Sequence, residues 1–281
     1  MTSLLAWFAA DGKKDVNYMP ASVYIATDSL ITWQDGDVWQ HGKKVFACST
    51  SPDVFGFCGD RLFASVVLGQ VVNSIDSGYL FNDGEDAASR MSKVAQLIWQ
   101  LWDTYPPKKK DKVHILHVTR EGEGVGARFI CQEHKLYPAK APQVMAPIVA
   151  PSGERSRPLM ARGTGEASVT DSIDEWNRQF SNRHTSRAMF AAFCGSVQSR
   201  KDSATGGVPQ LVGLYRIGNG RNFGVVWNDK LYFDGMFTLS KTNKEGVKWL
   251  NHTFEIVDPK TRLRAAGAAS HIHIYDLGGK G

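Results

Sequence analysis

Thr2, which follows the initiator methionine, is the most informative residue of this chain for its possible chemistry. A threonine at the first position of a processed chain supplies a nucleophilic hydroxyl and, in its own α-amine, a base for the hydroxyl proton. That amine titrates near ~7.7–8.0, so a usable fraction is neutral at cellular pH. Threonine is also small enough for removal of the preceding Met1. Many proteins begin Met-Thr, so Thr2 indicates little until other residues join it.

Further polar and glycine residues stand at the ends of expected strands and helices. Asp28 closes a strand in Ala-Thr-Asp-Ser, and Lys44 of Gly-Lys-Lys-Val follows it by sixteen positions. Gly59 of Gly-Phe-Cys-Gly-Asp ends a strand directly before a helix. The remaining candidates lie later in the chain, and they are Thr164 in Gly-Thr-Gly together with Asp202 and Thr205 in Asp-Ser-Ala-Thr-Gly-Gly.

In their order and spacing these segments resemble the proteasome-type N-terminal-nucleophile hydrolases, which include the proteasome β subunits and the bacterial two-ring proteasome-like peptidase. The family pattern has an N-terminal Thr, an Asp-Ser, a Lys-Lys-Val/Ile, an Ala-Gly-Gly turn, a Gly-Ser-Gly and an Asp-x-x-Ser-Gly-Gly. Here Cys58-Gly59-Asp60 replaces Ala-Gly-Gly, and Thr164 and Thr205 replace the two serines. The resemblance covers about residues 2–233, and it implies no cofactor and no metal.

The resemblance implies a role for each residue. Thr2 attacks a carbonyl carbon, and Lys44, held by Asp28, lowers the pKa of the threonine hydroxyl and amine. The backbone N–H of Gly59 stabilises the oxyanion. Thr164, Asp202 and Thr205 form hydrogen bonds around the α-amine and position it. The wall beside the nucleophile, which would receive the substrate, is expected to be formed by Gly42, Phe46, Phe57 and Arg61.

Several of these residues also have a purely structural interpretation. Asp28 and Asp202 stand where turn residues are common, and Thr164 is a candidate N-cap of the helix that follows it. Lys44 is interpretable as an exposed lysine at a strand end, with Lys43 buried in its place. Gly59 and Asp60 can begin and cap the next helix whether or not Gly59 takes part in catalysis.

Hydrophobic patterning predicts the elements that position these residues. Runs rich in β-forming residues at 2–10 and 23–28 indicate a hairpin, with residues 11–22 as its long loop. The helical period at residues 61–75 places Leu62, Val66, Gly69, Val72 and Ile75 on one helical face. A second helix covers residues 85–105, where Pro106 ends it. The other expected strands are 44–48, 54–58, 113–119, 127–137, 210–217, 223–227 and 230–233, and the other helices are 166–180 and 185–200.

This order of strands, two helices, strands, two helices and strands predicts an α+β protein. We expect a four-layer αββα sandwich, in which helices cover the outer faces of two stacked antiparallel sheets. The proline-rich residues 138–158 are expected to be a surface excursion. Residues 1–235 would form the proteasome-like domain, and residues 236–281 a C-terminal extension packed on it or trailing from it.

Composition is that of an ordinary globular protein, with 42% hydrophobic and 22% charged residues. The net charge of +5 is a mild excess that does not demand nucleic acid as a partner. The lysine-rich run at 108–112 is predicted to be a solvated loop, and Trp7, Trp33 and Trp39 to be packing residues. No apolar run approaches the ~20 residues that cross a membrane. The four cysteines have no metal-ligand spacing, which favours reduced thiols in the cytoplasm.

Other candidate chemistry is less specific. His271 and His273 alternate as on a strand, but no matching cysteine or carboxylate pattern supports a metal site. Cys58, beside the proposed oxyanion glycine, is interpretable as a reactive thiol, although a buried small hydrophobe fits better.

The sequence therefore predicts a cytoplasmic threonine peptidase or amidohydrolase that cleaves peptide bonds through an acyl-enzyme on Thr2. Its substrate would be a peptide or unfolded protein. The resemblance implies a homo-oligomer, in which a ring and an ATPase unfoldase partner are possible. The alternatives are a non-catalytic structural subunit of a proteasome-like assembly and a basic module that binds nucleic acid, for which no reading motif is visible.

Overall fold

The computed structural model describes residues 2–10, 20–33, 35–153, 155–178, 183–238 and 246–268. Most of the expected first hairpin loop and the His271 and His273 pair lie outside these ranges. Within the described ranges, no helix is long and apolar enough to cross a membrane.

The larger sheet contains the N-terminal hairpin, whose strands β1 (Ser3–Ala9) and β2 (Ser22–Thr27) pair in antiparallel register. Its strand order is β11 (Arg157–Gly163), β1, β2, β12 (Gln210–Tyr215), β13 (Arg221–Trp227), β14 (Lys230–Phe233) and β15 (Met236–Phe237). Leu4 lies opposite Thr27. The start of β1 lies beside the end of β2, so Thr2 and Asp28 come together at the same end of these two strands.

The smaller sheet has the order β10 (Ile148–Val149), β8 (Arg128–Leu136), β7 (Val113–Glu121), β6 (Asp53–Gly59) and β5 (Val45–Ala47), and β9 (Gln143–Val144) also pairs with β8. All its pairings are antiparallel among the described residues. Lys44 directly precedes β5, and Gly59 ends β6. The expected strands of this sheet are confirmed.

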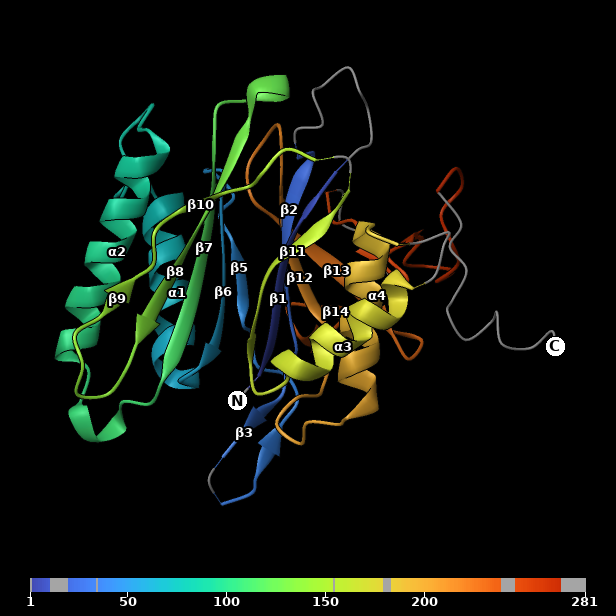
Figure 1. Ribbon diagram of the computed structural model, residues 1–281, viewed down its shortest axis with the longest axis horizontal. Helices are drawn as coiled ribbons and strands as arrows, with labels where there is room; N and C mark the ends of the chain where they lie inside the picture. The colour runs from blue at the N-terminus through green and yellow to red at the C-terminus, as the bar shows by residue number, and fades with distance from the viewer. Residues whose placement is uncertain are drawn as a thin grey trace.

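In the part of the chain that the structure describes, four α-helices flank the sheets, as the sequence predicts. They are α1 (Arg61–Asp76), α2 (Ala87–Thr104), α3 (Glu166–Asn177) and α4 (Ser186–Ser199). Figure 1 shows α1 and α2 beside the strands of the smaller sheet, and α3 and α4 on the opposite side of the molecule, against the larger one. The α+β class, with antiparallel sheets and two helix pairs, is confirmed.

Three apolar clusters hold these parts together. Residues of α1 and α2 pack on the smaller sheet through Phe55 and Phe57, whereas α3 and α4 pack on the larger sheet through Leu5 and Trp7. A third cluster joins residues of both sheets, for example Ile25 and Val118. Strand residues alternate between two clusters because successive side chains of a strand point to opposite faces.

The buried face of α1 agrees with the predicted apolar face only in part, at Ile75. Leu62 and Val66 are 60% and 48% exposed, while Phe63, Val67 and Val71 are buried. The helix has two apolar stripes, and the one that carries the phenylalanine covers more of the sheet and of Trp102 in α2, whose ring lies 4.8 Å from that of Phe63. Hydrophobic period alone does not choose between two such stripes.

Other elements were absent from the prediction. A small hairpin, β3 (Ile31–Thr32) and β4 (Val38–Trp39), projects beyond the larger sheet, and β11 forms from the end of the proline-rich segment. Short 3₁₀ turns occur at Pro107–Lys109 and Gly124–Gly126. After residue 235, β16 (Trp249–Leu250) pairs with β13, and β17 (Ile256–Val257) pairs with β16. The described part of the C-terminal extension therefore packs on the larger sheet.

Candidate active site

The Lys44 ammonium group lies at the point where the two sheets meet and contacts Thr2. Its Nζ donates hydrogen bonds to Thr2 Oγ1 at 2.6 Å, to the carbonyl oxygen of Leu30 at 2.6 Å and to Asp28 Oδ1 at 3.1 Å. A protonated lysine has three N–H donors, and three acceptors surround this one. Because Lys44 donates to Thr2 Oγ1, the hydroxyl hydrogen of Thr2 must point elsewhere and remains free for a base.

Asp28 is the centre of this arrangement rather than a simple turn residue. Its Oδ1 accepts the N–H of Ser3 at 3.0 Å as well as Lys44, and its Oδ2 accepts the N–H groups of Leu30 and Gly206, each at 3.1 Å. Four donors from four segments of the chain thus converge on one buried carboxylate. This compensates the cost of burying the charge and fixes the lysine beside Thr2.

Burial and the partner carboxylate act on Lys44 in opposite directions. Removal from water lowers the pKa of Lys44, and the Asp28 charge raises it, with burial the larger effect. Lys43, by contrast, is partly exposed and pairs with Asp234 at 2.6 Å. Of the two neighbouring lysines, Lys44 is therefore the one buried at Thr2.

Gly59 borders a small cavity together with Thr2, Lys44 and Phe57. The cavity has a volume of about 20 Å³, which is room for one water molecule. The φ of Gly59 is +110°, and a Cβ there would lie 2.1 Å from the carbonyl oxygen of Lys112. Only glycine fits here, because of its positive φ and its close approach to the backbone of Lys112. The next residue, Asp60, caps α1 by accepting the N–H of Phe63 at 2.9 Å.

A chain of hydroxyl groups leads from Ser3, the residue after Thr2, to Asp202. Thr164 and Thr205 donate to Asp202 Oδ2 at 2.5 and 2.8 Å, and Ser3 Oγ lies 2.8 Å from Thr205 Oγ1. Because Thr205 gives its one hydroxyl hydrogen to Asp202, Ser3 is the donor in that pair. Burial alone would raise the pKa of Asp202, but these hydrogen bonds outweigh it and leave the pKa lowered.

Thr164 does not cap α3, for which the N-cap is Gly165 without a side-chain hydrogen bond. The glycine before Thr164 brings the two chain segments together. Gly163 has a φ of +100°, and a Cβ there would lie 1.8 Å from the carbonyl oxygen of Thr2. The Gly-Thr-Gly segment is thereby packed directly against the first residues of the chain.

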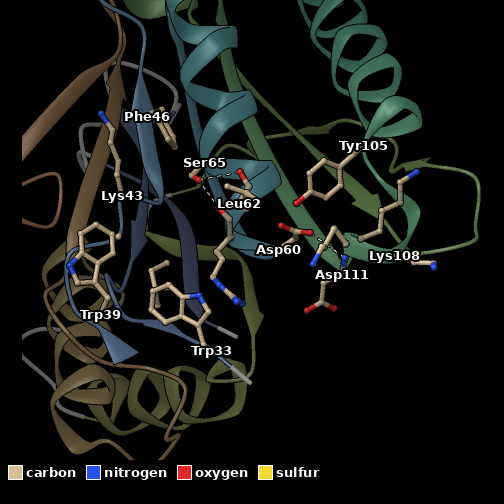
Figure 2. Close-up of a pocket in the computed structure, with 15 residues that line it drawn as sticks. Trp33, Trp39, Lys43, Phe46, Asp60, Leu62, Ser65, Tyr105, Lys108 and Asp111 are labelled. Carbon is tan, nitrogen blue, oxygen red and sulfur yellow. Dashed lines mark hydrogen bonds between the residues drawn. The ribbon is translucent and has the colours of Figure 1, made fainter. Parts of the chain in front are cut away.

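A larger pocket of about 820 Å³ adjoins the small cavity, with which it shares Ile31, Arg61 and Asp111 as lining residues. Three of the four residues expected at the substrate wall, Gly42, Phe46 and Arg61, line this pocket, whereas Phe57 lines the small cavity. Figure 2 shows Phe46, Trp33 and Trp39 on one side of the pocket and Tyr105 and Lys108 on the other.

The pocket corrects one prediction. Trp33 and Trp39 are 39% and 52% exposed and line the pocket, so they are not core packing residues, although Trp7 is buried. Because β3 and β4 form a projecting hairpin, both rings lie outside the core between the two larger sheets. Lys108 and Lys109 are exposed, as expected of a solvated loop, and together with the half-buried Lys110 they also line the pocket after the 3₁₀ turn that follows α2.

Gln210 is a further residue at the site that the sequence did not reveal. Its Nε2 donates to the carbonyl oxygens of Gly42 and Asp28 at 2.6 and 3.3 Å, and its Oε1 accepts the N–H of Lys44 at 3.2 Å. It thus ties β12 to the segments that carry the lysine and the carboxylate. The only local signal is an amide at the start of an apolar strand, which does not identify its partners.

Cys58 does not provide a nucleophile. Its side chain is buried, and burial raises the pKa of the thiol to about 12, so the thiolate is scarce at neutral pH. Among the described residues, no group of three or more histidine, cysteine, aspartate or glutamate side chains could hold a metal ion.

No family model matches the sequence, and no curated protein matches it. Solved structures do match the fold. One is the Anbu complex of Pseudomonas aeruginosa, described as a helical assembly, which is 12% identical over 78% of this chain and 86% of that chain, with a TM-score of 0.51. Another is Anbu, an ancestral β-subunit, from Yersinia bercovieri, 10% identical over 75% of this chain and 82% of that one, with a TM-score of 0.50.

The eukaryotic HslV of Trypanosoma brucei also matches, at 11% identity over 75% of this chain and 99% of that chain, with a TM-score of 0.45. The resemblance to proteasome-like proteins that the sequence motifs indicate is confirmed at the level of fold.

Proposed function

We propose that this protein is a threonine peptidase of proteasome type in which Thr2, exposed as the first residue by removal of Met1, is the nucleophile. The observation that carries the proposal is the 2.6 Å hydrogen bond from the buried Lys44 ammonium to Thr2 Oγ1, with Asp28 holding the lysine. The succession of helices, sheet, sheet and helices supports the four-layer αββα sandwich as its architecture, with residues 236–281 as an extension of that domain.

The first half of the reaction forms an ester. The α-amine of Thr2 takes the hydroxyl proton, and Oγ bonds to the carbonyl carbon of the substrate. The positive charge of Lys44 favours the developing alkoxide, and the N–H of Gly59 stabilises the oxyanion of the tetrahedral intermediate. The protonated amine then gives its proton to the leaving nitrogen, and the carbon–nitrogen bond breaks.

The second half releases the acyl group. Water, deprotonated by the same α-amine, attacks the ester carbon, and the proton returns to Thr2 Oγ as that bond breaks. The small cavity beside Thr2 has room for this water. In this scheme Asp202, with the hydroxyl groups of Thr164 and Thr205, positions the first residues of the chain and lies in contact with no substrate atom, so its role is one of positioning.

We propose a peptide or an unfolded protein as the substrate, Gly42, Phe46, Phe57 and Arg61 as its contacts, and a cytoplasmic location. We also propose a homo-oligomer, which the fold likeness to an Anbu helical assembly supports. An ATPase unfoldase is the kind of partner that would deliver an unfolded chain to such a site.

Thr2→Ala tests the assignment. Loss of the nucleophile should reduce the hydrolysis of fluorogenic peptides by about 10⁴-fold or more, with an unchanged Tm and circular dichroism spectrum. Retention of full activity by Thr2→Ala would show that another group performs the chemistry. A wild-type protein with no activity on any peptide would favour the non-catalytic structural subunit.

A further inference from the structure

The pocket beside Thr2 carries more positive than negative charge in its lining. Arg61 and the three lysines at 108–110 line it, and within the described residues none of the four forms an ion pair. Lys43, the fifth cation of the lining, is already paired with Asp234. Unpaired cations gathered around one concave site raise the local concentration of anions.

The two carboxylates of the lining do not cancel this charge. Asp60 is buried and accepts the N–H groups of Phe63 and Asp111 at 2.9 and 3.1 Å, which fixes it at the start of α1. Asp111 accepts the N–H of Lys112 at 2.7 Å. Four unpaired cations therefore face two carboxylates, which leaves the lining with an excess of positive charge.

Aromatic rings complete the wall and hold a cation in place. The Arg61 guanidinium lies 5.2 Å from the centre of the Trp33 ring, and the Lys110 ammonium lies 4.9 Å from that of Trp102. These contacts stabilise the cations without reducing their charge. Trp33 and Trp39 leave ring surface exposed on the side of the pocket opposite Tyr105 and Lys108 (Figure 2), where it is open to an apolar stem or a peptide plane.

We propose that this pocket selects an acidic side chain, aspartate or glutamate, next to the peptide bond that Thr2 attacks. The carboxylate would lie among Arg61, Lys108 and Lys109, and the methylene groups and backbone would contact Trp33. Arg61 lines both the pocket and the cavity at Thr2, so it is the cation that links recognition to the reacting bond. This inference rests on the proposed function for the position of the scissile bond.

Binding to the Thr2→Ala protein tests the selection without requiring activity. Two uncleaved peptides that differ only in one glutamate or glutamine are titrated by calorimetry. We expect the glutamate peptide to bind about tenfold more tightly at ~0.05 M salt, and the preference to shrink at ~0.5 M because exposed charges are screened.

A charge-reversed pair of variants shows whether these lysines are responsible. In the Thr2→Ala background, Lys108→Glu with Lys109→Glu should abolish or invert the preference. Lys230→Glu with Lys260→Glu, which changes two exposed lysines outside the pocket lining and alters net charge equally, should leave the preference in place.

Equal affinity for the two peptides would overturn the inference, and so would a preference that survives reversal at residues 108 and 109. Displacement of the glutamate peptide by a single-stranded oligonucleotide that binds more tightly would also contradict it, in favour of a nucleic-acid ligand. Failure of the proposed function looks different, because wild-type protein would then cleave no peptide, whatever the outcome of the titrations.

Discussion

Strand β6 has a buried threonine, cation and carboxylate near each of its ends. At the Gly59 end, Thr2 accepts a hydrogen bond from Lys44, which pairs with Asp28. At the Asp53 end, Thr119 accepts one from Arg90 at 2.6 Å, and Arg90 pairs with Asp53 at 3.2 Å. The two sets use the same three kinds of group, and all the carboxylates and hydroxyls are buried.

Position in the chain separates the two sets. Thr119 lies inside β7, so its nitrogen is an amide that cannot serve as a base. Thr2 borders a cavity and becomes the bearer of a free amine when Met1 is removed. Asp53 is further occupied by His117, whose Nε2 lies 2.7 Å from Oδ1, and by the hydroxyl of Ser51. A hydroxyl beside a buried ion pair is thus by itself only a structural feature. A free amine and an adjoining cavity would make it a potential active site.

Among the variants that test this difference between the two ends of β6, Lys44→Ala should have the largest effect on activity and stability. Lys44→Ala should lower peptide hydrolysis by about 100-fold or more, because the alkoxide loses its neighbouring cation. It should also cost about 3–5 kcal/mol of unfolding free energy, since Asp28 keeps a buried charge without its cation. Initial rates and urea denaturation measure the two effects.

Lys43→Ala is the matched control. Its exposed ion pair with Asp234 contributes about 0–1 kcal/mol, so activity and stability should change little. The reverse ranking of the two lysines would mean that the structural interpretation of Lys44 is right and its catalytic role wrong.

Asp53→Asn should destabilise the other end of β6 without changing the rate of peptide hydrolysis. Breaking the pairs with Arg90 and His117 should cost about 3 kcal/mol, seen as a lower Tm. The activity per folded molecule, measured well below that Tm, should stay within about twofold of wild type, because Asp53 contacts none of the groups around Thr2. A loss of activity much larger than the loss of folded protein would show that the two ends are coupled.

Glu133 on β8 provides a smaller effect with a defined pH dependence. Its burial raises the pKa, but His114 and Arg162, at 2.6 and 2.7 Å, outweigh it and hold the pKa of Glu133 at about 2. A carboxyl with a depressed folded-state pKa contributes stability above its unfolded pKa of ~4.3, and loses it as the pH falls toward 2.

Glu133→Gln should therefore cost about 1–2 kcal/mol at pH 7. The difference from wild type should shrink below pH ~4.3 and be nearly absent at pH 2. Urea midpoints over this range measure it, and a difference independent of pH would argue against the charge of Glu133 as the cause.

The parts of the fold that the sequence predicted are those with strong local patterns. Apolar runs and helical period predict the first hairpin and both helix pairs. Motif spacing predicts that Thr2, Asp28 and Lys44 come together. The α1 face was predicted only in part, because Leu62 and Phe63 begin two competing apolar stripes, between which only tertiary packing decides.

The rest depended on contacts between distant residues. Gln210 joins Gly42, Asp28 and Lys44 across more than 160 positions, and no local pattern encodes such a partner. The β3–β4 hairpin and the turn at residues 107–109 likewise bring Trp33 and Lys108 to one pocket. In the sequence, Trp33 looks like an ordinary packing residue and Lys108 like part of an ordinary loop. The candidate nucleophile was visible in the sequence, whereas the character of the pocket beside it was not.

The central claim is that Thr2 becomes a free N-terminal nucleophile, and intact-mass spectrometry with a peptide epoxyketone tests it most directly. We predict a purified protein that lacks the mass of Met1 and gains one inhibitor, located on the peptide that begins at Thr2. Thr119→Ala should label like wild type and Thr2→Ala should not label at all. Retention of Met1, or an adduct that persists in Thr2→Ala, would contradict the account.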